Sequence, residues 1–389
     1  MRRSILLSII LVAAGTTSAD AQSIFSSRGL GVPVSPVDAR ARALGGIGVG
    51  LLGRNPSLVN PAEAADYSFR GATAALQSTN RSIQVDGVER DAAASRFPLV
   101  RIIMPLRERI VLSAGYGGFL DQSWSAFRDR TEIIGTDTVA VRDRIDANGG
   151  IAEVQIGAAY RVSSALALGL AGGLYSGRVD HDIYRHFLED VLPGVEDIRI
   201  RSSWSQRAPF VTVGLRWDPA SVLRFGGSFT WAGELRGTAD DPGTSDFVIE
   251  LPLEAAAGAS AILSPGLLGT VGARWAGWSR TAGAFPSDDA PADTWQFGAG
   301  IEWEGRPGSA RTFPIRVGYH YNQYPFRIEG VTPTEKAVAL GIGARFVPTD
   351  AGPLASMDAA LERGSRDAPG SGLGEKFWRF TVSLALFGL

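Results

Sequence analysis

Segments of roughly ten residues, in which large apolar side chains alternate with small or polar ones, recur along most of this chain. In residues 165–175, ALALGLAGGLY, four leucines fall on one face of an extended strand. Residues 223–231 and 315–322 follow the same rule, with arginine, serine or asparagine on the opposite face. Because successive side chains of a strand point to opposite faces, each segment has one apolar and one polar face. This pattern is typical of a barrel whose outer wall meets lipid and whose interior is polar.

About fourteen such segments can be counted, an even number, as in single-chain bacterial barrels. The predicted strands span 67–78, 94–106, 109–120, 150–161, 166–179, 198–217, 222–237, 246–263, 267–282, 294–304, 313–326, 335–347, 355–363 and 376–387. Their connections alternate between short and long, which predicts periplasmic turns and external loops. We expect a second hairpin within 121–149 and a helical turn at 187–191. Pro252 cannot donate to a sheet hydrogen bond, so a bulge is expected there.

Soluble β-sandwiches and propellers also alternate, but their outer faces are polar and their turns are more closely spaced. In this chain almost every predicted strand has an apolar face. Amphipathic rings also recur near the strand ends, where they suit the boundary between lipid and water; these are Tyr160, Trp217, Trp231, Trp275, Trp295, Trp303 and Trp378. We therefore assign the chain to the all-β class, as a transmembrane antiparallel β-barrel of about 14 strands.

The N-terminal part of the chain differs from the rest. Residues 1–21 look like a signal peptide, because two arginines precede an apolar stretch and Ala19-Asp20-Ala21 forms a small-x-small cleavage site. Residues 22–65 contain few alternating runs and many glycines and prolines, which indicates a compact segment without regular strands. The barrel is expected over 66–389. No apolar run reaches the ~20 residues that a spanning helix needs, so the predicted location is the bacterial outer membrane, with the lipid bilayer as a partner.

Composition argues against several functions. The net charge of −2 disfavours nucleic acid as a partner, because phosphate binding requires a basic surface. The absence of cysteine excludes disulfides, thiolate metal sites and thiol catalysis. Residues 46–50, GIGVG, resemble a nucleotide-binding loop, but Leu51 occupies the position of the third glycine.

The histidines form no convincing site either. A metal site from His181, Asp182 and His186 is conceivable, but a solvated external loop is the favoured interpretation. No set of nucleophile, base and orienting residue is visible. We therefore expect no enzymatic activity, no metal and no cofactor.

A family resemblance is carried by residues 41–62, ARALGGIGVGLLGRNPSLVNPA. This stretch resembles the N-terminal segment of the FadL-type outer-membrane transporter superfamily, which includes PorV-like proteins. The matching residues are Gly45, Gly46, Gly48, Asn60, Pro61 and Ala62. The resemblance implies a fourteen-stranded barrel plugged by an N-terminal hatch, here residues 22–65. The closing segment, GEKFWRFTVSLALFGL, resembles the last strand of PorV-like members. It implies the barrel-assembly machinery as a partner of the C-terminal strand.

The polar faces of the predicted strands carry charges of both signs. We expect a lumen polar network formed by Glu153, Arg224, Glu250, Arg274, Glu302, Arg316, His320, Arg345 and Arg379. An open ion pore would more often show one dominant sign. Mixed charges favour ion pairs and hydrogen bonds around a plug, although simple solvation of the barrel interior explains any single residue equally well.

Three glycines, Gly115, Gly117 and Gly118, cluster on the third predicted strand. In FadL-type proteins a kink in this region opens a side exit to the bilayer, and clustered glycines permit bulges and bends. The resemblance therefore suggests a lateral opening here. Close packing of the backbone against the hatch is the alternative, and the sequence does not separate the two.

The predicted function is an outer-membrane channel for passive uptake of hydrophobic small molecules, such as long-chain fatty acids or hydrocarbons. Such ligands cross a polar envelope poorly, and a barrel can offer them an apolar pocket and a side route. Phe119, Phe127 and Phe187 are candidate pocket residues by their position. The alternative is a PorV-like structural or secretion-associated barrel that binds protein partners.

Overall fold

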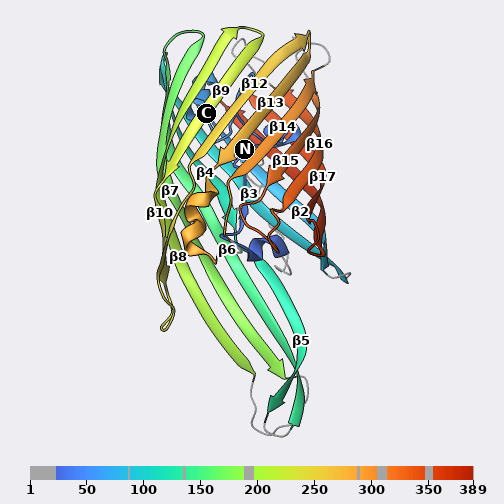
Figure 1. Cartoon of the computed structure of the whole chain (residues 1–389). Coiled ribbons are helices and arrows are strands. Elements are labelled where there is room, and N and C mark those ends of the chain that lie inside the picture. Colours follow the sequence, from blue (N-terminus) through green and yellow to red (C-terminus); the bar gives the residue numbers. More distant parts are fainter. Residues whose placement is uncertain are drawn as a thin grey trace, which may run out of the picture.

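A computed structural model describes residues 23–85, 88–134, 137–187, 197–286, 290–304, 313–346 and 354–388. Fourteen antiparallel strands form a closed barrel, in which the last strand pairs with the first (Figure 1). This confirms the predicted fold and strand number. The proposed signal peptide and most of the predicted turn at 187–191 lie outside the described residues.

The wall strands follow each other around the ring in chain order. They are β2 (Gly71–Val85), β3 (Val88–Arg107), β4 (Ile110–Asp121), β6 (Asp137–Arg161), β7 (Leu166–Phe187), β8 (Ile198–Ala220), β9 (Leu223–Ala232), β12 (Glu254–Ser264), β13 (Leu267–Ala276), β14 (Thr294–Trp303), β15 (Ile315–Gln323), β16 (Thr334–Phe346), β17 (Ala355–Ala368) and β18 (Leu373–Phe387). Three short strands extend this wall beyond breaks in the ladder: β5 (Trp124–Ile134), β10 (Glu234–Ala239) and β11 (Phe247–Glu250).

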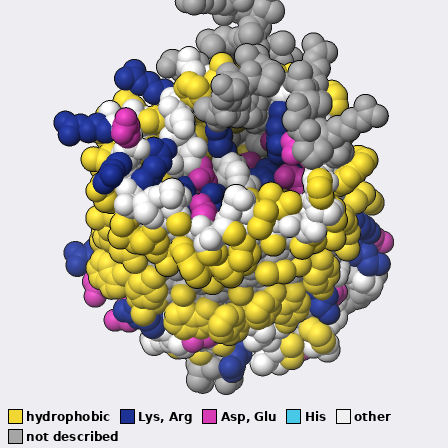
Figure 2. All heavy atoms as spheres, turned by 90° about the horizontal axis from the view of Figure 1, so that it is seen from above, with side chains coloured by type: hydrophobic (Ala, Val, Ile, Leu, Met, Phe, Trp, Pro, Cys, Tyr) yellow, Lys and Arg dark blue, Asp and Glu magenta, His cyan; other side chains and the backbone are white. Residues whose placement is uncertain are grey.

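The outer face of the wall is apolar. Along β8, Val211, Val213 and Leu215 are exposed, whereas Thr212 and Arg216, at alternate positions, are buried on the inner side. Hydrophobic side chains cover the visible outer face in a broad band, and charged side chains gather at its edges and in the hollowed end (Figure 2). Among the described residues, no helix is long and apolar enough to cross a membrane.

Four strands project far beyond the others at one end of the barrel. They are β6, β7 and β8, together with β5 (Figure 1). The predicted second hairpin within 121–149 is present, because β5 pairs with the first half of β6 from Ile134 opposite Asp137 to Trp124 opposite Ala147. Much of what the sequence suggested as loop is therefore strand. Polar side chains on both faces of these extensions hide the alternation on which the prediction relied.

The N-terminal segment fills the barrel (Figure 1). It contains η1 (Ile24–Ser27), β1 (Val32–Pro33), α2 (Ala39–Ala43) and η2 (Pro61–Asp66). Every side chain of α2 is buried, including two arginines. We call residues 23–66 the hatch. A further 3-10 helix, η3 (Trp278–Ala284), lies where a strand was predicted to continue to residue 282.

The ladder breaks between β9 and β10 and between β11 and β12. Thr230 pairs with Glu254 and Glu234 pairs with Glu250, but between these two register pairs no residue of one side pairs with the other, and only Trp231 and Ala232 stay paired, with β8. Pro252 lies in this break, so the bulge predicted for it is instead an interruption of the ladder. Proline removes a donor from the ladder, which explains why the strand stops here.

Candidate functional site in the barrel lumen

Asn60 attaches the hatch to the wall at the start of η2. Its side-chain oxygen accepts a hydrogen bond of 3.0 Å from the backbone N–H of Ala62, while its amide group donates one of 2.9 Å to the carbonyl of Leu215 on β8. Pro61 follows at the first helical position, where its missing N–H costs nothing. A Cβ atom on Gly214 of β8 would lie 2.1 Å from the Asn60 side-chain oxygen. The Asn-Pro-Ala motif therefore docks into a wall site that only glycine can form.

The glycine run forms the opposite side of the hatch. Gly45, Gly46 and Gly48 have φ values of 96°, 75° and 71°, in the left-handed region that favours glycine. A Cβ atom on Gly45 would lie 2.5 Å from the backbone nitrogen of Ala299 on β14. The motif glycines thus allow both a tight turn and close contact between hatch and wall.

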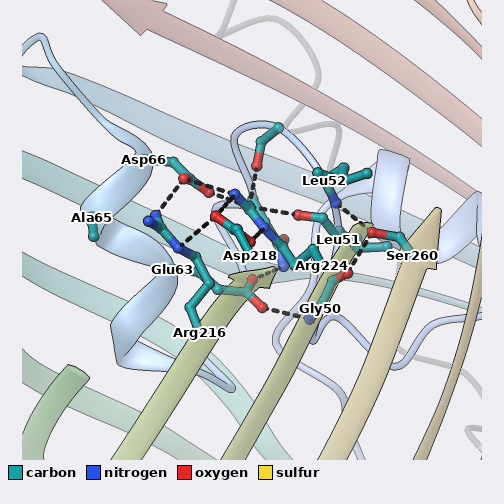
Figure 3. A network of polar contacts seen from close by, with 12 residues as sticks. Gly50, Leu51, Leu52, Glu63, Ala65, Asp66, Arg216, Asp218, Arg224 and Ser260 are labelled. Atoms are coloured by element: carbon teal, nitrogen blue, oxygen red, sulfur yellow. Dashed lines mark hydrogen bonds and ion pairs between the residues drawn. The ribbon is translucent and has the colours of Figure 1, made fainter. Parts of the chain in front are cut away.

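Asp66 at the end of η2 lies between two arginines of the wall (Figure 3). Its carboxylate accepts hydrogen bonds from Arg216 of β8 and from both terminal nitrogens of Arg224 of β9, one of them at 3.1 Å. Asp218 forms ion pairs with the same two arginines, and Arg224 Nε donates a hydrogen bond of 2.7 Å to it. Arg224 Nη1 also donates to the Leu51 carbonyl of the hatch, at 3.0 Å. Hatch and wall are therefore joined here by a compact, largely buried network.

Glu63 is the buried acid at the centre of the hatch. It accepts hydrogen bonds from the backbone N–H of Gly50 and from the side chains of Asn55 and Asn60. Burial raises the pKa of Glu63 to about 7, and the hydrogen bonds from Gly50 and Asn55 oppose the shift. This carboxyl group thus holds the glycine run and the Asn-Pro-Ala motif together.

A second network joins α2 to the wall at β14, β15, β16 and β17. Glu302 accepts from Arg40 Nε at 2.8 Å and from Arg316 Nε at 2.6 Å, and Arg316 also pairs with Asp358 at 2.7 Å. Arg345 lies 3.7 Å from Glu302 and is partly exposed. Of these residues, Glu302, Arg316 and Arg345 were predicted from their place on the polar face.

A third network lies beside η1 and is formed by His320, Glu335, Arg366, Glu375 and Arg379. Glu335 accepts from Arg366 Nε at 2.7 Å and from His320 Nε2 at 2.9 Å. Glu375 accepts from the Ser23 hydroxyl at 2.7 Å. The hatch is therefore tied to three separate sectors of the wall. The acidic partners here were missed, because alternation identifies a face but not which charges meet across strands.

Two further predicted lumen residues lie in a small polar cavity. Glu153 and Arg274 line a space of about 50 Å³ together with Glu254, and Glu153 Oε1 has no hydrogen-bond partner among the described residues.

Glu250 does not belong to the lumen network. Its side chain is 57% exposed on the outer face, 3.5 Å from Arg280. The break at Pro252 inverts the alternation, so that Glu250 faces outwards although Glu254, four residues later, lines the lumenal cavity. An uninterrupted alternation would have placed both on the same face, which is why the prediction was wrong.

The glycines proposed for a lateral opening face the hatch. Gly115 and Gly117 pair with both neighbouring strands, and a Cβ atom on either would lie within 2.6 Å of hatch side chains. Beyond Gly117, β4 leaves β3 and pairs with β1 of the hatch instead, with Val32 opposite Asp121. Close packing thus accounts for Gly115 and Gly117, while the wall changes partner from Gly118 onwards.

Apolar side chains fill the lumen next to this change of partner. Phe119 stacks on Tyr175 with ring centroids 3.9 Å apart, Tyr175 stacks on Phe210 at 4.4 Å, and Trp278 of η3 lies 6.4 Å from Phe119. We call these four residues the aromatic cluster. Phe119 was predicted as a pocket residue, but the other three were not. The remaining two candidates, Phe127 and Phe187, lie on the extended hairpins.

The cavities around the hatch differ in size. The polar space beside the aromatic cluster measures about 50 Å³ and another, next to the third network, about 40 Å³. A larger pocket of about 540 Å³ lies between the hatch and the short-turn end of the barrel, lined by Leu52, Tyr67 and Phe387 among others. Ligand pockets usually measure ~300–1,000 Å³. Only the last of these three spaces reaches that range.

Solved structures with the same fold include three outer-membrane proteins. A FadL homologue from Pseudomonas aeruginosa superposes with a TM-score of 0.62 at 15% identity, covering 92% of this chain and 100% of the other. The toluene transporter TbuX from Ralstonia pickettii gives 0.56 at 17% identity, with coverage of 90% and 98%. The toluene transporter TodX from Pseudomonas putida gives 0.57 at 14% identity, with coverage of 93% and 99%. Comparison with curated proteins found no match.

The fold expected from the FadL-type resemblance is thus confirmed. A family model named BamG matches residues 1–205, which include the whole hatch, the wall from β2 to β7 and the first part of β8. This is more than half of the chain. The protein is an outer-membrane β-barrel with the FadL-type fold, and it belongs to the BamG family.

Proposed function

We propose that this protein is a plugged barrel that works through protein partners in the assembly of other outer-membrane barrels. The match to the BamG family, whose name belongs to the Bam series of barrel-assembly components, carries this proposal. It corresponds to the second of the two functions considered from the sequence, with barrel assembly as its specific form.

The attachment of the hatch supports a scaffold. Asp66, Arg40 and Ser23 join it to three sectors of the wall, and most of the ionic groups involved are buried. Removing one partner of a buried ion pair costs ~3–5 kcal/mol, because the other charge stays buried. Moving the hatch would break several such contacts together. A barrel stiffened in this way suits a surface that must keep its shape for partners.

The test is chemical crosslinking in native membranes followed by affinity purification of the tagged chain. We expect the central barrel-assembly insertase to be captured in stoichiometric amount, and depletion of this chain to reduce the folded fraction of other barrels. An unrelated barrel with the same tag is the control. Absence of the insertase together with normal barrel levels after depletion would contradict the proposal.

A second function, passage of small hydrophobic molecules, is favoured by the aromatic cluster. Its rings lie beside Gly118, where β4 exchanges β3 for β1, so an apolar region adjoins a discontinuity in the wall. The similar structures include toluene transporters. In this second function a ligand enters along the aromatic cluster and leaves through the lateral opening predicted near Gly118.

Uptake of radiolabelled toluene and of a long-chain fatty acid by cells with and without the chain tests this second function. Enlarging the passage by Phe210→Ala should raise the rate of uptake. Replacing Phe127, on the extended hairpin, by alanine is the matched control. Equal uptake by all cells would contradict transport and would leave the partner experiment unaffected.

A further inference from the structure

A groove on the outer face of the wall lies where β8 passes the break between β9 and β10. It has a volume of about 910 Å³. Its lining combines apolar side chains with three arginines and two glutamates; the residues used below are Leu174, Arg207, Trp231, Glu234, Arg236, Glu250 and Arg280. None of them belongs to the lumen networks.

The groove lies at the edge of the apolar band. On the outer face of β8 the side chains of Val213 and Val211 are exposed, Pro209 follows, and Arg207 is next. Trp231 ends the apolar face of β9 in the same way and is 48% exposed. Tryptophan at such a position marks the boundary between the hydrocarbon region and the headgroups. The arginines therefore lie at headgroup level, on the side of the long hairpins.

Two of these arginines face each other directly. Arg207 of β8 is the register partner of Arg236 of β10, and both side chains are exposed on the outer face. Like charges directly opposite one another on neighbouring strands are destabilising. Arg236 has a glutamate at 3.5 Å, and Arg207 has no ion pair with any residue in the described part of the chain. An anion placed between Arg207 and Arg236 would contact both guanidinium groups.

The break in the ladder creates this arrangement. Trp231 and Glu234 both point outwards although they are an odd number of positions apart, with Ala232 and Gly233 between them, so the alternation inverts near Gly233. The inversion near Pro252 places Glu250 beside Arg280 of η3 in the same groove, at 3.5 Å. Three arginines against two glutamates leave one net positive charge beside the apolar half of the groove.

We propose that this groove binds a phosphate-bearing lipid of the outer leaflet. The acyl chains lie against Leu174 and Trp231, and the phosphate lies between Arg207 and Arg236, with Arg280 at its side. Charge-assisted hydrogen bonds from guanidinium groups match the oxygens of a phosphate and relieve the repulsion between the arginines. A lipid fits better than a free anion, because half of the groove is apolar. The inference is independent of the proposed function.

Native mass spectrometry of the detergent-purified full chain with added diphosphoryl lipid A tests the proposal. We expect one lipid to stay bound at low excess, and at least tenfold weaker binding in Arg207→Gln/Arg236→Gln. The matched control, Arg107→Gln/Arg109→Gln, removes two exposed arginines at the short-turn end and should bind as the wild type does. If the double variant does not fold, as judged by heat-modifiable mobility, Arg280→Gln replaces it and should weaken binding severalfold.

Two further comparisons decide the chemistry of the ligand. Lipid A without its phosphates should bind at least tenfold more weakly, and inorganic phosphate at millimolar concentration should not displace the lipid. Equal binding by the wild type and the groove variants would overturn the proposal. So would equal binding of the dephosphorylated lipid, or displacement by inorganic phosphate.

Discussion

Replacement of Asp66 by asparagine should loosen the hatch. The carboxylate is the hatch side of the network with Arg216 and Arg224, and it accepts three charge-assisted hydrogen bonds. The substitution keeps the shape and removes the charge. Asp218 remains in contact with both arginines, so the cost falls below that of leaving both unpaired.

The magnitude follows from these contacts. Hydrogen bonds to charged groups contribute ~1.5–3 kcal/mol each, and breaking a buried ion pair costs ~3–5 kcal/mol. Because Asp218 compensates in part, we expect Asp66→Asn to lower the free energy of hatch opening by about 3 kcal/mol, the lower end of the range for a buried ion pair. Since 1.36 kcal/mol corresponds to a factor of about ten, the open population of the hatch should rise by roughly 150-fold.

The absence of native cysteine permits a direct assay. Ser57 lies in the hatch with a fully buried side chain, so a thiol introduced by Ser57→Cys reacts with maleimide only when the hatch opens. The labelling rate in Asp66→Asn should exceed that of the parent by about two orders of magnitude. Asp129→Asn, which breaks an exposed ion pair with Arg142 on the long hairpins, should leave the rate unchanged.

A double variant separates the two causes. If the cost arises from a buried arginine left without its partner, the loss of hatch stability in Asp66→Asn/Arg224→Gln should be smaller than the sum of the losses in the two single variants. An increase of less than threefold in Asp66→Asn, or strict additivity in the double variant, would refute the reasoning from a buried ion pair.

Three further outcomes are expected. Burial raises the pKa of Glu63 from 4.5 to about 7, so the closed hatch binds this proton more tightly than the open hatch does. The free energy that holds the hatch closed should therefore fall by about 3 kcal/mol as the pH rises from 4.5 to about 7. The labelling rate of the hatch thiol, normalised to an exposed thiol, should rise over the same pH range, and Glu63→Gln should remove this pH dependence. Gly214→Ala should destabilise by ~1–3 kcal/mol in urea titrations through its collision with the Asn-Pro-Ala motif, whereas Gly227→Ala, with no atom closer than 3.7 Å, should change little. Phe210→Ala should cost ~3–5 kcal/mol in the same titration, because it removes a stacked ring from a packed cluster; a loss below 1 kcal/mol would show that the cluster is loosely packed.

The fold could be predicted because the side-chain period of a strand is visible in a single sequence. Residues on the polar face, such as Arg224 and Glu302, were placed in the lumen correctly for this reason. The prediction of Glu250 was wrong, because a break in the ladder inverts the period and leaves only a proline as its trace. The true length of β6 was hidden for a different reason, since its extension carries polar residues on both faces.

The aromatic cluster could not be predicted as a unit. Phe119, Tyr175, Phe210 and Trp278 come from four elements far apart in the chain, and their contact depends on strand register. The same holds for the ionic networks: the sequence shows which charges face inwards, but pairing such as that of Glu335 with Arg366 requires the ring to be closed at a known stagger.

The seam between β18 and β2 limits the routes by which the hatch can reach the lumen. Fifteen register pairs, from Leu373 opposite Val85 to Phe387 opposite Gly71, join the last strand to the first. The hatch immediately precedes β2 and lies inside the finished cylinder. Once the seam is closed the wall offers the hatch no entry, so the hatch is either enclosed while the seam forms or enters through an end of the cylinder. Its position next to the first strand keeps it beside the seam while the sheet closes.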